Sequence, residues 1–371
     1  MYGAQLIGAL RARWPHAALN FFGVGGDRMR AAGCDVVVDA RELSVVGILE
    51  ILGHLPDIWA LFHRLIAEAD RRKPDLAIVI DAPAFNWRVA REMKKRRVPV
   101  VYYVCPQFWA WRQKRVRLLR KYVDRALVIF PFEESFFRAR GVPAEFVGHP
   151  LTELPRPSLS REDYARKHGL DESRQWIALM PGSRIKEVRM NLPGMLGSAA
   201  LLDGAFEYLL PVATGLDPAL VDSLVRGVSG ELRGRIHLVN EALPALAHSR
   251  AAIIASGTAT VEAAMMETPF VMVYRVNPLT YRLGRSLVKV PYFAMVNLIA
   301  GEQIVPELVQ DDFTGERVRA EINKILPSGS PREKMLDGLR RVKTLLRGQD
   351  HSDLPPLARA AQAIAELVKP H

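Results

Sequence analysis

The sequence predicts an α/β protein of two domains, each built on a parallel β-sheet. Its 371 residues are more than one hydrophobic core usually serves. Short apolar runs rich in β-branched residues alternate with helical patterns, and such alternation predicts right-handed βαβ units with parallel strands. A proline-rich segment interrupts the alternation once. Because 49% of the residues are hydrophobic and 25% are charged, disordered, collagen-like and coiled-coil proteins are excluded.

The first half of the chain contains four candidate strands with helices between them. The strands are expected at residues 76–80, 98–104, 125–129 and 145–147, and the helices near 85–96, 112–121 and 132–140. The chain opens on a helical pattern with Leu6 and Leu10, and no strand precedes it. Since a parallel α/β domain normally begins with a central strand, either this domain begins unusually or the sequence lacks its natural beginning.

A second alternation follows a linker, which residues 147–160 predict because they contain three prolines. Its strands are expected at 176–180, 208–212, 236–239, 252–255 and 270–274, with helices near 186–201 and 258–266. We therefore expect an N-terminal domain over 1–150, a linker over 151–160, a C-terminal domain over 161–345 and a helical segment over 346–371. Two such halves predict a cleft between them, with ligands at the carboxyl ends of the strands.

The net charge of +11 is concentrated in the first half. Residues 1–150 carry 24 basic and 15 acidic residues, and the stretch 88–125 alone holds 13 basic and two acidic ones. This excess indicates an anionic partner: nucleic acid, an acidic membrane surface or a phosphorylated substrate. A solvated basic face without a partner is the alternative. Nucleic acid is the weaker choice because no known recognition motif occurs.

Several classes of protein lack their signals in this sequence. Cys34 and Cys105 are too few for a disulfide scaffold and have no zinc-site spacing, which fits a reducing cytoplasm. The histidines show no metal-ligand spacing and no Asp-x-Asp pair occurs, so no metal ligands are visible. Neither a secretory signal nor 18 uninterrupted apolar residues appear. We expect neither secretion by that route nor a membrane span.

In the first half, Asp81 is the candidate catalytic residue. It ends the strand 76–80, and a carboxylate at the carboxyl end of a parallel strand can take a proton from an attacking hydroxyl. An aspartate there is also often a helix cap. The segment 105–115 has two tryptophans, Trp109 and Trp111, beside three cations. These side chains suit the binding of a sugar, an acyl chain or a phosphate; alternatively, the tryptophans only pack on the sheet. The glycines of 23–29 predict a binding loop or a tight turn.

In the second half, two loops have the composition of anion sites. The first loop follows the strand 176–180 and contains Ser183 and Arg184. Its glycine lets a ligand come close to the backbone, the helix start offers free amides, and the arginine adds a guanidinium. The loop of Ser256, Gly257 and Thr258 follows another strand, so the pair suggests a shared diphosphate.

Two further polar residues of the second half are candidates, with weaker signals. Glu262, one turn into the next helix, could accept hydrogen bonds from a ribose, or it stabilises the helix dipole. Asn297 begins a further candidate loop, 297–301 followed by 305–308, whose signal is weak.

Residues 44–65 are strongly apolar with few charges. Taken alone, this helical segment is more typical of core packing than of an interfacial membrane patch.

Six motifs in order make the chain resemble the lipid-A-disaccharide synthases over nearly its whole length. They are DAPAFNWRVA, YYVCPQFWAWRQKRV, FPFEESFF followed by FVGHPL, LMPGSR with EV, ASGTATVEAA, and VPYFAMVNLIAGEQIVPELVQ. The resemblance implies the GT-B glycosyltransferase fold, with two Rossmann-like halves and the nucleotide on the C-terminal one. It implies transfer of 2,3-diacylglucosamine from its UDP derivative to 2,3-diacylglucosamine 1-phosphate, giving a β-1,6-linked disaccharide 1-phosphate and UDP.

The resemblance also implies roles for the candidate residues. Asp81 matches the base of an inverting transfer. Ser183, Arg184 and the loop of Ser256, Gly257 and Thr258 would hold the diphosphate without a metal or other cofactor, and Glu262 and Asn297 match positions around the uridine and ribose. The enzyme would lie on the inner face of the cytoplasmic membrane of a Gram-negative cell, as a homodimer. With acylated substrates, membrane docking becomes the better interpretation of 44–65, beside the basic stretch 88–125.

Two departures from the family pattern bear on activity. Family members have a strand and a Gly-Glu-x-Ser-Gly-Asp loop ahead of Tyr2; if Met1 is the true start, we expect poor folding or no activity. Where many relatives have a second acid, this chain has Ala84. The alternatives are another UDP-sugar enzyme of the same fold, such as an epimerase or a transferase to a different acceptor, and a truncated, inactive relative.

Overall fold

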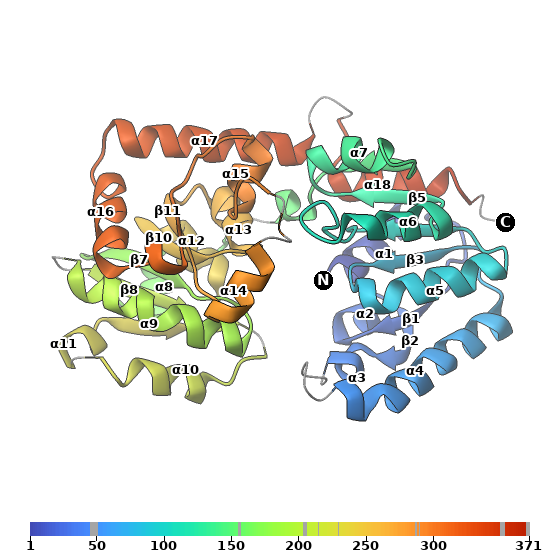
Figure 1. The fold of residues 1–371 in the computed structure, drawn as a ribbon, viewed down its shortest axis with the longest axis horizontal. Coiled ribbons are helices and arrows are strands. Elements are labelled where there is room, and N and C mark those ends of the chain that lie inside the picture. The colour runs from blue at the N-terminus through green and yellow to red at the C-terminus, as the bar shows by residue number, and fades with distance from the viewer. Residues whose placement is uncertain are drawn as a thin grey trace. The chain divides into compact units, whose positions relative to one another are not determined.

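A computed structural model describes residues 1–44, 51–154, 157–202, 206–213, 215–228, 230–285, 288, 290–348 and 353–368. The chain divides into two compact units, one of residues 1–150 with 346–371 and one of 151–345. The C-terminal segment, which the sequence suggested as a part of its own, thus belongs to unit 1. In both units, helices cover the faces of parallel sheets (Figure 1).

The described residues of unit 1 contain six strands in two separate sheets. Its elements are α1 (Tyr2–Arg13), β1 (Phe21–Gly25), α2 (Asp27–Ala31), β2 (Cys34–Asp39), α3 (Ala40–Ser44), α4 (Ile51–Arg72), β3 (Ala77–Ile80), α5 (Pro83–Lys95), β4 (Val100–Tyr103), η1 (Gln113–Arg115), α6 (Val116–Tyr122), β5 (Arg125–Val128), α7 (Pro131–Arg138), β6 (Ala144–Phe146) and α18 (Pro356–Ala365). Strands β1 and β2 pair with each other, and β3, β4, β5 and β6 form a four-stranded sheet in that order.

Between the two sheets of unit 1 lies an open groove of about 1010 Å³. Residues of α1, β1 and β3 line it, together with Ile364 and Val368 at the C-terminal end. The amide of Ala77 donates to the carbonyl of Pro99, just before β4, and the amide of Asp81 donates to that of Val104, just after it. Because backbone groups alternate along a strand, those of Ile78 face the groove, where β3 has no neighbouring strand among the described residues.

Unit 2 is built on one continuous six-stranded parallel sheet in the order β12-β11-β10-β7-β8-β9. Its elements are η2 (Pro150–Glu153), which begins at the boundary residue, α8 (Arg161–His168), β7 (Gln175–Met180), α9 (Ile185–Leu201), β8 (Phe206–Pro211), α10 (Pro218–Val225), α11 (Gly230–Arg233), β9 (Ile236–Val239), α12 (Ala242–His248), β10 (Ala251–Ala255), α13 (Ala259–Met266), β11 (Phe270–Tyr274), α14 (Pro278–Arg285), α15 (Met295–Ala300), β12 (Glu307–Val309), η3 (Gln310–Asp312), α16 (Gly315–Ile325) and α17 (Ser330–Arg347), which ends in unit 1.

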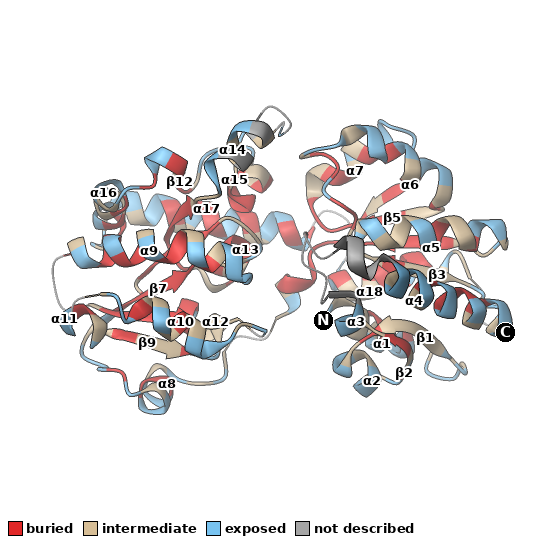
Figure 2. Cartoon of the chain, turned by 60° about the horizontal axis from the view of Figure 1, so that its bottom comes forward, coloured by how far each residue is buried: buried red, intermediate tan, exposed pale blue. Residues whose placement is uncertain are grey.

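The central strands of unit 2 are buried on both faces (Figure 2). Every residue of β10 is buried, and so is every residue of β7 except Gln175. Their sequences are therefore continuous apolar runs rather than alternating ones, as helices on both faces of a parallel sheet require. Local signals place the surrounding helices: Ser160 caps α8, its Oγ accepting the N–H of Asp163 at 3.1 Å, and Gly169 ends the helix with a φ of +66°.

The predicted elements mostly agree with these bounds, but the sequence analysis did not predict strands β1, β2 and β12. A further difference lies at 112–121. There the structure has a short 3-10 helix, η1, followed by α6. Arg112 is the reason, because its φ of +54° is left-handed and prevents an α-helix from starting at that residue.

Candidate functional site

In unit 1, Asp81 lies at the carboxyl end of β3 in a constrained backbone. Both Asp81 and Ala82 have left-handed φ angles, of +47° and +41°. The carbonyl of Asp81 accepts hydrogen bonds from Tyr102 Oη at 2.6 Å and from Asn86 Nδ2 at 2.7 Å. Burial raises the pKa of Tyr102, so this phenol remains a hydrogen-bond donor near neutral pH.

The carboxylate of Asp81 itself is exposed and has no hydrogen-bond or ion-pair partner among the described residues. A strained turn that is fixed by side chains and presents an uncommitted carboxylate is typical of a functional position. The alternative that Asp81 only caps α5 finds no support, because no side chain caps that helix. The geometry therefore suits a proton acceptor.

The loop after β4 contains two tryptophans with different environments. Trp109 is 6% exposed and its Nε1 donates to Glu133 Oε1 at 2.9 Å. The other oxygen of Glu133 accepts the amides of Ile129 and Phe130 at 3.2 and 3.1 Å, and burial raises the pKa of Glu133 to about 7. Trp109 thus packs in the fold, whereas Trp111 is 44% exposed with a guanidinium stacked on it and remains available to a ligand.

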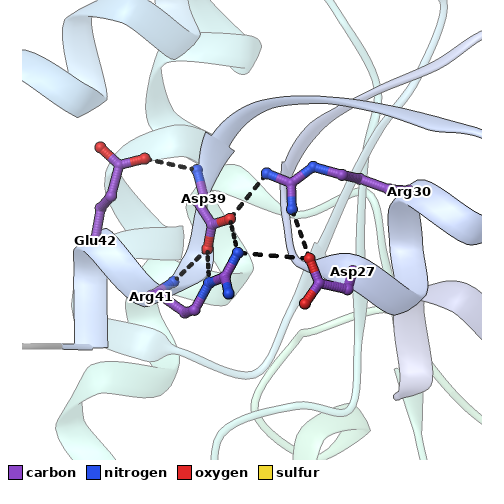
Figure 3. Close-up of polar contacts among 5 residues, drawn as sticks. All are labelled: Asp27, Arg30, Asp39, Arg41 and Glu42. Atoms are coloured by element: carbon purple, nitrogen blue, oxygen red, sulfur yellow. Dashed lines mark hydrogen bonds and ion pairs between the residues drawn. The ribbon is translucent and has the colours of Figure 1, made fainter.

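The glycine-rich segment 23–29 is part of a charged network at the end of the β1–β2 sheet (Figure 3). Asp39 accepts from Arg30 at 2.8 Å and from Arg41 at 2.9 Å, and Asp27 accepts from Arg30 at 2.9 Å. Hydrogen bonds from Arg41 and Arg30 hold the pKa of Asp39 well below its usual range. These carboxylates and guanidinium groups satisfy one another, which favours a structural turn over a binding loop.

In unit 2, the two predicted anion loops lie side by side at the carboxyl ends of two neighbouring central strands. Strand β7 leads to Ser183 and Arg184 and strand β10 leads to Ser256, and the two strands are paired, with Ile254 opposite Met180. Ser183 and the side chain of Arg184, 82% exposed, reach solvent. The tertiary structure therefore brings together the two loops that lie about seventy residues apart in the sequence.

The loop of Ser256, Gly257 and Thr258 leaves open space at its centre. Gly257 has a φ of +146°, and a Cβ added there would meet nothing within 4 Å. Glu262 follows in the first turn of α13, half-buried and with no hydrogen-bond partner among the described residues, and burial raises its pKa. An unpartnered, half-buried carboxylate beside an open loop can accept hydrogen bonds from a ligand's hydroxyl groups.

Asn297 has a different surrounding from the one expected. It is fully buried, and its Nδ2 donates to Val305 O at 2.9 Å and Glu307 Oε1 at 2.8 Å, while its Oδ1 accepts the amides of Ile304 and Val305 at 2.8 and 3.0 Å. An amide side chain offers two donors and two acceptors, so none is left for a ligand. The side chain of Asn297 therefore organises the loop around α15, and its hydrogen-bonding groups are not available to a ligand.

The structure adds polar residues that the sequence analysis did not identify. Glu187 Oε2 accepts the amides of Ser183 at 3.0 Å and Arg184 at 3.2 Å. The buried Asn191 holds the same loop, donating to Pro181 O at 3.3 Å and accepting the amide of Arg275 at 2.8 Å. Glu187 was detectable, because an acid three residues after a helix start is a capping signal. Asn191 left no signal, since the amide that its side-chain oxygen accepts comes from Arg275, 84 residues along the chain.

The apolar segment 44–65 lies partly outside the described residues, which omit 45–50. In the described part of α4, Phe62 and Leu65 are buried in the core of unit 1, and Trp59 is 54% exposed. No helix in the described residues is long and apolar enough to cross a membrane. Within the same residues, no three His, Cys, Asp or Glu side chains form a group that could hold a metal ion.

Comparison with known proteins identifies the family. A family model described as lipid-A-disaccharide synthetase matches residues 1–359. The chain belongs to this family. Relatives with the name lipid-A-disaccharide synthase include that of Koribacter versatilis, 48% identical over 369 residues with 100% of this chain and 96% of the relative covered. That of Acidobacterium capsulatum is 44% identical over 375 residues, with 98% and 93% covered.

Solved structures agree on the fold. The glycotransferase of kitacinnamycin superposes with a TM-score of 0.64 at 16% identity, covering 98% of this chain and 94% of the other. CalG4, the calicheamicin glycosyltransferase, gives 0.60 at 17% identity, with 99% and 94% covered. A putative UDP-N-acetylglucosamine 2-epimerase from Listeria monocytogenes also gives 0.60, at 13% identity with 95% and 94% covered, so the fold alone does not separate transferase from epimerase.

Family membership confirms three predictions from the sequence. The resemblance to the lipid-A-disaccharide synthases, the GT-B architecture of two α/β domains, and the assignment as a glycosyltransferase of lipid A biosynthesis are all correct. The roles of single residues rest on the geometry described above.

Proposed function

We propose that this chain transfers 2,3-diacylglucosamine from its UDP derivative to 2,3-diacylglucosamine 1-phosphate, forming the β-1,6-linked disaccharide 1-phosphate and UDP. Family membership supports the reaction. The observation that carries the proposal in this chain is the pairing of β7 with β10 in the centre of a buried sheet. This pairing brings together, at the carboxyl ends of the two strands, the loop of Ser183 and Arg184 and the loop of Ser256 and Thr258.

Unit 2 binds the leaving group in this proposal. The guanidinium of Arg184 and the backbone amides at the starts of α9 and α13 offset the charge of the diphosphate, as helix N-termini do for anions. Glu262 accepts hydrogen bonds from the ribose hydroxyls. The charge that develops on the leaving phosphate is stabilised by these donors, so the proposed mechanism needs no metal ion or other cofactor.

Unit 1 supplies the base. The 6-hydroxyl oxygen of the acceptor attacks C1 of the donor sugar, the bond from C1 to the phosphate oxygen breaks, and the hydroxyl proton passes to Asp81. Attack from the face opposite the leaving group inverts the configuration at C1. The exposed carboxylate of Asp81 on a fixed backbone supports this role, since a general base must reach its proton without moving the chain.

An anionic bilayer surface is the second element of the proposal, on the cytoplasmic face of the inner membrane. Five exposed cations of η1 and α6 have no acidic partner among the described residues: Lys114, Arg115, Arg117, Arg120 and Lys121. The exposed Trp111 and Trp59 suit the boundary between headgroups and acyl chains. The homodimer stays a prediction; within the chain, α18 packs on α1.

Product analysis tests the reaction. The purified chain is given acylated donor and acceptor in detergent micelles, and the products are identified by mass spectrometry. We expect the tetra-acylated disaccharide 1-phosphate with one UDP per disaccharide, and neither product from deacylated substrates. Conversion of the UDP-sugar without an acceptor would show an epimerase instead, and failure of the purified, folded chain to turn over would favour an inactive relative.

Co-sedimentation tests the membrane surface. Vesicles of phosphatidylethanolamine with phosphatidylglycerol should bind the chain, and neutral phosphatidylcholine vesicles should not. A variant with Lys114, Arg117 and Lys121 changed to Gln should lose most of this binding at unchanged UDP affinity. Equal binding of the variant would contradict the assignment of this surface.

A further inference from the structure

Glu187 occupies the amides that the proposed function assigns to the diphosphate. Its Oε2 accepts the N–H of Ser183 at 3.0 Å and of Arg184 at 3.2 Å, and its Oε1 lies 3.2 Å from Arg184 Nη1. The amides and the guanidinium of this loop thus already hold an anion, and that anion belongs to the chain itself. Carboxylate and phosphate oxygens are alternative acceptors for the same kind of donor.

The loop is shaped to let this carboxylate approach. Gly182 has a φ of +124°, and a Cβ added to it would lie 2.6 Å from both Cβ and Oε2 of Glu187. Any side chain at this position would displace Glu187, and the left-handed φ disfavours every residue except glycine. The space beside Gly182 is therefore filled by the Glu187 carboxylate.

The carboxylate is partly exposed to solvent, while the loop that holds it is fixed. The side chains of Arg184 and Glu187 are 82% and 27% exposed, so water screens their ion pair. The buried amide of Asn191 meanwhile ties the loop and α9 together through Pro181 O at 3.3 Å and Glu187 O at 2.9 Å. The Glu187 carboxylate can leave without rearrangement of the backbone.

We propose that Glu187 is a resident anion that the donor's diphosphate must displace, and that it thereby sets the affinity of unit 2 for phosphate ligands. The proposal rests on the proposed function, because it concerns the same loop. A ligand that contacts only this loop competes with the carboxylate and binds weakly. A nucleoside diphosphate that also contacts the loop of Ser256 to Thr258 displaces it, and the returning carboxylate promotes release of UDP.

The variant Glu187→Gln tests this without removing a hydrogen-bond acceptor, since the amide oxygen can still cap the loop. Calorimetry with UDP, inorganic pyrophosphate and uridine gives the dissociation constants. Two like charges about 4 Å apart repel appreciably even when water screens them. We therefore expect UDP and pyrophosphate to bind at least about fivefold tighter to the variant, with uridine, which has no phosphate, unchanged.

A matched control separates the local effect from net charge. Asp163 lies in the first turn of α8 in the same unit, so Asp163→Asn removes one negative charge from another helix start. Its UDP affinity should equal that of the unchanged chain. Equal tightening in this control, equal tightening for uridine, or an unchanged or weaker UDP affinity of Glu187→Gln would each overturn the role of Glu187. If the unchanged chain binds no UDP, the proposed function falls as well; if it binds and the variant binds equally, only this inference falls.

Discussion

The sheets of the two units differ in continuity, and the difference follows the division of the proposed chemistry. In unit 2, β7 and β10 each pair with a strand on both sides, and the phosphate loops follow these central strands. In unit 1, β3 pairs only with β4 among the described residues, and the groove of about 1010 Å³ lies along its other edge. Asp81 follows this edge strand.

A central strand is held by hydrogen bonds and apolar packing on both sides, so loops after it are well positioned. An edge strand lacks half of these hydrogen bonds and packs against fewer side chains. The structure compensates locally at Asp81, where Tyr102 and Asn86 hold the backbone carbonyl. In the proposed mechanism, the leaving group is therefore bound by loops that follow central strands, whereas the base is positioned by a few side chains around an edge strand.

The largest expected effect is a loss of turnover without a loss of UDP binding. Asp81→Asn should lower kcat by about 10²–10⁴-fold, the usual contribution of a general base, while UDP affinity, which belongs to unit 2, stays unchanged. UDP release and calorimetry measure the two. Asp75→Asn, at the amino end of the same strand, is the matched control and should keep full turnover; full turnover of Asp81→Asn would remove Asp81 as the base.

The next effect compares the two sheets directly. Ile254 in β10 is 0% exposed, so Ile254→Ala leaves a closed cavity and should cost about 2–5 kcal/mol of unfolding free energy. Ile78 of β3 lines the open groove, and Ile78→Ala should cost only about 1 kcal/mol because part of that surface is not enclosed. Urea unfolding followed by circular dichroism gives both values. Equal losses would show that the groove does not weaken the packing of β3.

A smaller effect concerns the phosphate loop. Arg184→Ala should weaken UDP binding about 10–100-fold, as the loss of a charged hydrogen-bond donor does, and leave the fold intact. Arg189→Ala, one turn further along α9 and exposed, is the control and should bind UDP normally. An unchanged dissociation constant for Arg184→Ala, measured by calorimetry, would refute the assignment of the loop to the phosphates.

The last effect is a pH dependence of stability in unit 1. Burial raises the pKa of Glu133 from 4.5 to about 7, so the folded chain binds more protons than the unfolded chain between those pH values. The free energy of unfolding therefore falls as pH rises through this window, by at most about 1.4 kcal/mol per pH unit. Above pH 7 the full destabilisation by the buried, charged Glu133 is present, and below pH 4.5 it is absent.

The difference between the unchanged chain and Glu133→Gln isolates this dependence. Burial lowers the pKa of His149 to about 3, which makes stability rise with pH between 3 and 6.5, but His149 is present in both chains and cancels. Urea unfolding at a series of pH values measures the difference, which should fall from pH 4.5 to 7 and then level off. A difference that does not vary with pH would contradict the raised pKa.

The alternation of strands and helices, the two-unit division and the family motifs followed from the sequence alone. Continuous apolar runs such as 251–255 have only one stable location, a sheet covered on both faces. A glycine-containing loop between such a strand and a helix likewise predicted the place of Ser183 and Arg184 at the start of α9. These signals are local, so the sequence carries them in full. The prediction of free amides at the start of α9 was wrong, because Glu187 Oε2 accepts both.

Only the tertiary structure decided how polar residues distant in the sequence share their hydrogen bonds. The sequence predicted Asn297 as a ligand contact, but hydrogen bonds to Ile304, Val305 and Glu307 occupy all donors and acceptors of its side-chain amide. Trp109 and Trp111, two residues apart, differ because Glu133 binds only the first. Hydrogen-bond capacity is consumed by whichever group packing brings nearest, and no local pattern states which group that is.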